Sequence, residues 1–235
     1  DKVYILMKIA VLYAYPPEPD GLSLQGHLLY RGLKQLGVDV MPCHYAPSLQ
    51  KQWILSALKP DIAIGIGCWT SAPDIILSPQ NNGVLPVPWL VANGWVANYQ
   101  KTISSLPLVF ATSHWVLDTY KRDGVDVSNF SVLPIGFDRE ETRPIPQSDP
   151  KVQKLREMLG IQPDEKMILT IGGDATSKGA QEMLKALAQI DKTFKNWKYV
   201  CKASNSECAE EHHQEEEKLI EELGLDKDKI IYLTG

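Results

Sequence analysis

Short apolar runs, each long enough for one β-strand, alternate along this chain with segments whose apolar residues recur every three or four positions. The first run is residues 8–13 (KIAVLY), and residues 22–36 then place leucines on one face of an expected helix that ends at Gly37. Strand-helix alternation of this kind indicates a parallel sheet with helices on both faces. We therefore expect an α/β fold with a Rossmann-like parallel sheet.

The same alternation continues to the end of the chain. In the first part, further strands are expected at residues 39–43, 61–66, 88–92, 108–112 and 131–133, and helices at 49–58 and 114–123. In the second part, helices are expected at residues 151–159, 178–190 and 207–223, and strands at 167–171, 198–202 and 230–233.

A polar segment interrupted by prolines, residues 137–150 (FDREETRPIPQSDP), separates two parts of different composition. Residues 1–145 hold 23 charged side chains and residues 146–235 hold 30, so the second part is much denser in charge. Proline continues neither a helix nor a central strand. We predict an N-terminal domain at residues 7–137, a linker at 138–150 and a partial second domain at 151–235. The second domain is expected to be partial because its helices would have too little sheet to cover.

The charge and the cysteine content of the chain indicate which partners and which cellular compartment to expect. The net charge is −5 and basic residues form no stripe, so nucleic acid is not an expected partner. Four cysteines without CxxC spacing, Cys43, Cys68, Cys201 and Cys208, favour a reducing compartment, and a cytoplasmic location is expected. The apolar runs are far shorter than the roughly 18 residues that cross a bilayer, which leaves only contact with a membrane surface open. The oligomeric state is not predicted.

The turn after the strand at 167–171 has the chemistry of a phosphate site. Gly172 and Gly173 permit close approach of the backbone, and Ser177 could cap a helix whose first residues include Lys178 and Gly179. Free N–H groups at a helix N-terminus and a neighbouring ammonium group attract a diphosphate. A solvated first-turn lysine is the alternative interpretation of Lys178.

Three segments, in order, resemble the two-domain glycosyltransferases of the GT-B architecture, specifically the large retaining family 4. They are the opening strand, Pro/Gly loop and helix (residues 8–40), the passage ATSHWVLDTYKRDGVDVSNFSVLPIGFDREETRP (111–144), and ILTIGGDATSKGAQEMLKAL (168–187). The resemblance spans the chain. It implies transfer of a hexose-type sugar from a UDP- or GDP-linked donor to an unknown acceptor, with retention at the anomeric carbon.

The resemblance also implies roles for particular residues. Gly172, Gly173, Lys178 and Gly179 would bind the donor diphosphate, with no cofactor or metal required. Gly173 replaces an arginine of the family motif, which removes one positive charge. The family's E-x7-E segment, which holds the donor's ribose and sugar, is expected beyond Gly235.

In the first domain, Asp20, Gly21, His114 and Gly136 would lie near the cleft that binds the substrates. By the resemblance, Asn93 stands where family members place a histidine and would be the catalytic residue; its amide can bond a sugar hydroxyl but cannot titrate.

Several side chains have two interpretations from sequence alone. Glu18 and Asp20 suit sugar hydroxyls, although their loop could be a simple surface connection. Trp95 and Tyr99 could stack on a sugar or fill core. His114 could touch a substrate or cap the helix that it precedes.

Other functions remain as alternatives or are set aside. A catalytically degenerate nucleotide-sugar-binding or scaffold module is the main alternative, because Gly173 and Asn93 replace functional groups. An unrelated pair of Rossmann-like domains, as in periplasmic binding proteins or epimerases, is a third. Residues 65–70 (GIGCWT) lack the third glycine of a dinucleotide fingerprint, and no P-loop or G-x-S-x-G motif occurs. Cys208 and His212 share a helix face, but an amphipathic helix explains them better than a metal does.

Overall fold

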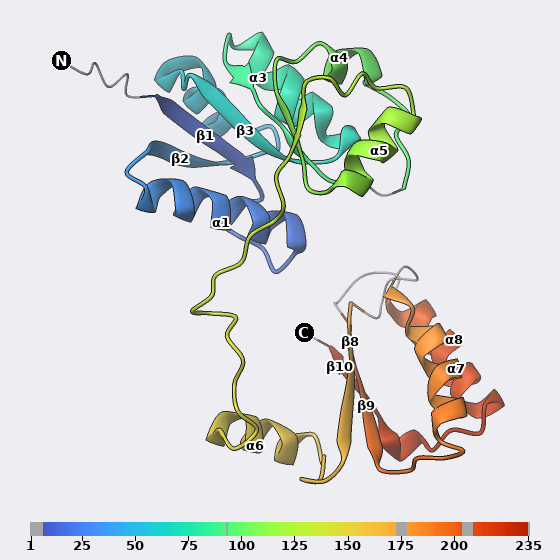
Figure 1. The fold of residues 1–235 in the computed structure, drawn as a ribbon. Coiled ribbons are helices and arrows are strands. Elements are labelled where there is room, and N and C mark those ends of the chain that lie inside the picture. Colours follow the sequence, from blue (N-terminus) through green and yellow to red (C-terminus); the bar gives the residue numbers. More distant parts are fainter. Residues whose placement is uncertain (1–6, 93, 173–177, 204–208, 235) are drawn as a thin grey trace. The chain divides into compact units, whose positions relative to one another are not determined.

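The computed structural model describes residues 7–92, 94–172, 178–203 and 209–234 (Figure 1). The chain forms two compact units, Asp1–Arg143 (unit 1) and Pro144–Gly235 (unit 2), and each is described by itself. Both are built on a parallel sheet, so the predicted α/β fold class is confirmed. None of the helices in these residues is long and apolar enough to cross a membrane.

Unit 1 has one parallel sheet of seven strands in the order β2-β1-β3-β5-β6-β7, with β4 paired to the start of β3. Its strands are β1 (Lys8–Tyr13), β2 (Asp39–His44), β3 (Ile62–Gly67), β4 (Leu85–Pro86), β5 (Trp89–Leu90), β6 (Val109–Ala111) and β7 (Phe130–Val132). The strand order reverses direction after β2, which makes the carboxyl end of β1 a topological switch point where ligands of open α/β sheets bind.

Alternate residues of β1 pack against different layers of unit 1. Val11 and Tyr13 lie in a cluster with Leu29 and Leu33 of α1 (Gly21–Gln35), which runs beside β1 and β2 in Figure 1. Leu12 lies instead in a cluster with Leu55. Further α-helices of the unit are α2 (Leu49–Trp53), which continues as a π-helix over Ile54–Leu58, α3 (Ser78–Asn81), α4 (Gln100–Ser104) and α5 (His114–Arg122). Helices therefore cover both faces of the sheet.

Unit 2 contains a three-stranded parallel sheet in the order β10-β9-β8. Its elements are α6 (Pro150–Met158), β8 (Lys166–Ile171), α7 (Ala180–Ile190), β9 (Trp197–Ala203), α8 (Ala209–Glu222) and β10 (Ile230–Thr234). Leu184 and Leu187 of α7 and Ile220 of α8 pack against the sheet in one cluster. Met167, Leu169 and Ile171 alternate along β8 and are exposed, so one face of this edge strand is open.

The structure differs from the sequence prediction at the start of α7 and in several short elements that were not predicted, among them β4, α4 and the helices of segment 69–81. The helix predicted at 178–190 begins at Ala180, because Gly179 adopts a left-handed conformation (φ 71°) and forms its N-cap. The segment 69–81, for which no element was predicted, holds a 3-10 turn (Trp69–Ser71), a π-helix (Pro73–Leu77) and α3. Pro73 and Pro79 each stand in the first turn of a helix, where proline is tolerated.

Candidate functional site

A hollow of about 260 Å³ lies where β1, β2 and β3 of unit 1 end. Tyr13 is the last residue of β1, Tyr45 follows β2, and Ser71 follows β3; all three line the hollow. The loop after β1 adds the carboxylates of Glu18 and Asp20, both singled out from sequence. Tyr13, Tyr45 and Ser71 were not predicted as site residues, because the pairing of β1 with β2 and β3 is what brings them together.

The loop that carries the two carboxylates is fastened to α1. The Asp20 carboxylate caps α1 by accepting from the Leu22 N–H (2.8 Å) and the Ser23 N–H (3.0 Å). The buried Ser23 hydroxyl accepts from the Glu18 N–H (2.7 Å) and donates to the Ala14 carbonyl (2.8 Å). Gly21 is the first residue of α1. The loop is thus an ordered part of the hollow, not a loose surface connection.

The side chain of Tyr13 is held in place by His27 of α1. Its hydroxyl lies 3.2 Å from Nδ1 of His27, and burial raises the pKa of Tyr13, so the phenol stays protonated. Such a phenol can donate or accept a hydrogen bond at the floor of the hollow. The hollow therefore offers hydroxyls and carboxylates, a set suited to the hydroxyl groups of a sugar.

The predicted residues after β5 and β6 fall into three groups. Asn93 lies outside the described residues. Trp95 is exposed, whereas Tyr99 packs partly buried against the core of the unit. His114 is exposed as the first residue of α5; its expected capping role is wrong, because the Ser113 side chain forms the cap by accepting from the Val116 N–H (3.2 Å). The shorter hydroxyl at the preceding position reaches the open amide.

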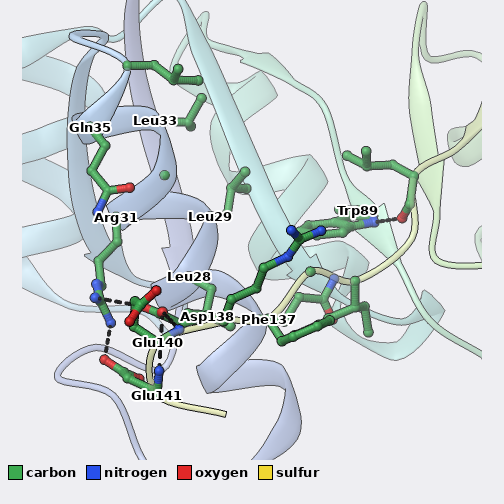
Figure 2. Close-up of a pocket in the computed structure, with 17 residues that line it drawn as sticks. Leu28, Leu29, Arg31, Leu33, Gln35, Trp89, Phe137, Asp138, Glu140 and Glu141 are labelled. Carbon is green, nitrogen blue, oxygen red and sulfur yellow. Dashed lines mark hydrogen bonds and ion pairs between the residues drawn. The ribbon is translucent and has the colours of Figure 1, made fainter. Parts of the chain in front are cut away.

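Gly136 lines a different, larger hollow of about 800 Å³ between α1 and the segment 133–141 (Figure 2). The structure does not bring it together with Asp20. The segment is tied down at one end by the Trp89 indole N–H, which donates to the Leu133 carbonyl (2.8 Å). At the other end, Arg31 forms ion pairs with Asp138 (3.0 Å) and Glu141 (2.8 Å). The pKa of Arg31 is raised, and its hydrogen bond to Glu141 is the main cause. Residues 138–141 are thereby attached to α1.

In unit 2 the predicted phosphate residues meet at the carboxyl end of β8. Gly172 is left-handed (φ 79°), and its N–H donates to the Lys202 carbonyl (2.7 Å) of β9. The exposed Lys178 folds over it, since two of its side-chain carbons lie 3.4 Å from where a Cβ on Gly172 would stand. Gly179 then opens α7. Gly173 and Ser177 lie outside the described residues.

The turn provides one cation beside a helix N-terminus, with an acidic neighbour. The first-turn amides of α7 follow Gly179, and Glu182 in that turn pairs with Lys185 at 3.8 Å. A negative ligand here would gain from Lys178 and the helix dipole. The residues that the structure describes contain no group of three or more His, Cys, Asp or Glu side chains placed to hold a metal. Cys208 and the His212 side chain lie outside that description.

Two Rossmann-like units in sequence are what the predicted GT-B architecture requires. No protein-family model and no curated protein matches the sequence. Solved structures do match. Anabaena HepE in complex with UDP and glucose is similar over 97% of this chain and 69% of its own, at 16% identity and a TM-score of 0.73. Trehalose-6-phosphate synthase OtsA is similar over 97% and 74%, at 12% identity and a TM-score of 0.64.

A UDP-forming α,α-trehalose-phosphate synthase from Burkholderia xenovorans, in complex with glucose-6-phosphate, is also similar. The match covers 96% of this chain and 74% of that protein, at 11% identity and a TM-score of 0.64. These likenesses confirm the predicted GT-B fold.

Proposed function

We propose that this chain belongs to a glycosyltransferase that moves a sugar from a nucleoside-diphosphate sugar to an acceptor hydroxyl, with retention at the anomeric carbon. The observation that carries the proposal is the turn after β8, where Lys178 lies over the left-handed Gly172 and Gly179 opens α7. The complexes of HepE with UDP and glucose support a UDP-linked donor as the first to test. The chain spans 69% of HepE, so the activity proposed is that of a longer protein.

The proposed chemistry concerns the leaving group. The bond between the anomeric carbon and the phosphate oxygen breaks, and its electron pair leaves with the nucleoside diphosphate. The acceptor oxygen bonds to the same face of the sugar, and its proton goes to the departing diphosphate. The Lys178 ammonium and the first-turn amides of α7 stabilise the charge that grows on that group. The chain's own residues supply this stabilisation, and we propose that no cofactor is needed.

Unit 1 supplies the acceptor side in this proposal. Glu18, Asp20 and the Tyr13 hydroxyl line the first hollow and would bind sugar hydroxyls. Asn93 follows β5 in the sequence and would hold a hydroxyl through its amide, next to the reacting carbon. His114 and Gly136 stay proposed substrate contacts, Gly136 from the wall of the other hollow. Four cysteines without CxxC spacing support a reducing, cytoplasmic location.

Calorimetric titration of the 235-residue chain with UDP and UDP-glucose tests the proposal. Lys178→Gln should weaken UDP binding about 10-fold, as expected for one lost charge-assisted contact of about 1.5 kcal/mol. Lys192→Gln removes an equal charge from the far end of the α7 segment, where Lys192 bonds to Gln189 (2.8 Å), and should leave affinity unchanged. Equal affinity of Lys178→Gln and the unaltered chain for UDP would refute the proposal.

A catalytically degenerate binding module is the second candidate, favoured by Gly173 and Asn93 in place of an arginine and a histidine. The two functions differ in turnover. The full-length protein is incubated with UDP- and GDP-sugars, and release of nucleoside diphosphate is followed. Hydrolysis or transfer supports the enzyme, whereas binding without release supports the module.

A further inference from the structure

Two tryptophans from neighbouring strands of unit 1 form an aromatic pair at the carboxyl edge of the sheet. Trp69 follows β3 and Trp95 follows β5, and these strands are paired, with Gly67 opposite Leu90. Their ring centroids are 5.2 Å apart and the ring planes meet at 55°. Trp69 packs against the core, whereas Trp95 keeps 57% of its surface exposed. The pair thus presents one indole to solvent and supports it with the other.

The loop that carries Trp95 is braced on both sides of this residue. Arg122, at the end of α5, donates to the Gly94 carbonyl (2.6 Å), and the Asp123 carboxylate accepts from the Val96 N–H (2.6 Å). Arg122 and Asp123 also bond to each other through two contacts, of 2.7 and 2.8 Å. The bond from Arg122, followed by that from Val96, lowers the pKa of Asp123, so the brace stays charged at neutral pH. Gly94 accommodates the turn with φ 89°.

An indole that a fixed loop keeps in water lowers the stability of the fold unless a ligand or partner covers it. Large apolar surface left in water forgoes its burial free energy, about 25 cal/mol per Å². Three polar contacts hold the residues on either side of Trp95, so that its indole stays at the surface. They are the two just described and a hydrogen bond from the Gln100 side chain to the Val96 carbonyl (3.3 Å). Such preorganisation favours binding, because little ordering is left to be done when the ligand arrives.

The surroundings of the pair indicate the chemistry of that ligand. The one-turn helix Trp69–Ser71 begins at the aromatic pair and ends at Ser71, which lines the first hollow with Tyr13, Glu18 and Asp20. An indole face stacks on the C–H face of a pyranose ring, and hydroxyls and carboxylates bind its hydroxyl groups. The two carboxylates would repel a phosphate, which favours a neutral sugar over a phosphorylated one.

We propose that Trp95, supported by Trp69, is the stacking platform for a neutral pyranose of the acceptor, and that Arg122 and Asp123 are its positioning residues. The inference rests on the proposed function, since it names the acceptor class of the same transferase. It assigns the acceptor sugar to unit 1, whereas the turn proposed for the donor diphosphate lies in unit 2.

Saturation-transfer NMR on the 235-residue chain tests the platform, with methyl glucoside, methyl galactoside and maltose as probes and with uridine as a competing flat ring, each with and without UDP. We expect transfer to the ring C–H protons of at least one sugar. Trp95→Ala should raise that sugar's dissociation constant about 10-fold, roughly the contribution of a lost aromatic contact. Trp95→Phe should retain most of the binding.

Trp115→Ala is the matched control, because Trp115 is 58% exposed on α5 of the same unit and should not affect binding. Asp123→Asn loosens the brace without touching the sugar, and should weaken binding while the line widths of the Trp95 indole signal change. The platform is refuted by absence of transfer to every sugar, by transfer to uridine alone, or by equal losses in Trp95→Ala and Trp115→Ala. UDP affinity is measured on each variant: unchanged UDP binding beside lost sugar binding separates this inference from the donor site.

Discussion

Gly26 of α1 faces Tyr13 of β1 so closely that a Cβ at position 26 would fall 2.4 Å from the Cβ of Tyr13. This contact sets the spacing between α1 and the sheet. Gly26→Ala should therefore destabilise unit 1 by about 1–3 kcal/mol, the range for overpacked cores. Gly32 lies on the same helix with open space around it, and Gly32→Ala should stabilise by about 0.5–1 kcal/mol. Urea unfolding measures both; equal effects of the two substitutions would contradict the close approach.

Asp20 caps α1 while lining the first hollow, and two substitutions separate these roles. Asp20→Ala removes the acceptor for the Leu22 and Ser23 amides and should destabilise by about 1 kcal/mol. Asp20→Asn keeps a capping oxygen and should change stability by only a few tenths of a kcal/mol. Thermal unfolding followed by circular dichroism measures the difference. An equal loss in both variants would show that the charge, and not the cap, is what stabilises the loop.

Gly172→Ala should lower both the affinity for UDP and the stability of unit 2, and the loss of affinity should be specific to this position. A left-handed alanine is unfavourable by about 1–2 kcal/mol, and its Cβ would press on the Lys178 side chain at 3.4 Å. Gly160→Ala is the control, because Gly160 is also left-handed (φ 62°) but has open space around it. It should share the loss in stability and retain UDP affinity. If both variants bind UDP equally well, the geometry of Gly172 and Lys178 does not matter for the ligand.

Unit 2 should lose stability in acid through Asp191. Hydrogen bonds from Lys195 (2.6 Å) and Lys229 (2.9 Å) lower the pKa of Asp191 from 3.8 to about 2. A carboxyl group with a lowered folded pKa stabilises the fold above its unfolded pKa, and that stabilisation disappears as pH falls through the folded value. The window is therefore pH 4 down to about 2.

Unfolding midpoints measured across this pH window check the Asp191 prediction. Asp191→Asn should flatten the pH dependence, whereas Lys195→Gln should retain much of it, since Lys229 still pairs with the carboxylate. An unchanged slope in Asp191→Asn would assign the acid sensitivity to other groups.

Periodicity predicted most of the fold because parallel strands are buried and apolar. Apart from β4, which was not predicted, the strands lie close to their expected places, as do the helices α1, α5 and α8. The start of α7 was wrong by two residues, since the left-handed conformation of Gly179 depends on the turn around it. No element was predicted for the segment 69–81, whose short helices carry no repeated apolar spacing of their own.

Fewer residues of the candidate site than elements of the fold could be predicted from the sequence. Glu18 and Asp20 were found because their loop follows the first strand, and Gly172, Lys178 and Gly179 because their spacing matches a motif. Tyr45 and Ser71 join the first hollow only through the pairing of β1 with β2 and β3, which no local pattern encodes. The brace on Trp95 joins residues nearly thirty positions apart, so only the folded chain shows that the indole is held outward.

The ion pairs of Arg31 with Asp138 and Glu141 have a practical bearing on how unit 1 should be produced alone. A protein that ends at Phe137 would lack both carboxylates that pair with Arg31, and part of the wall of the 800 Å³ hollow. A protein that ends at Arg143 keeps both ion pairs, so isotope-labelled samples for spectroscopy should extend at least that far.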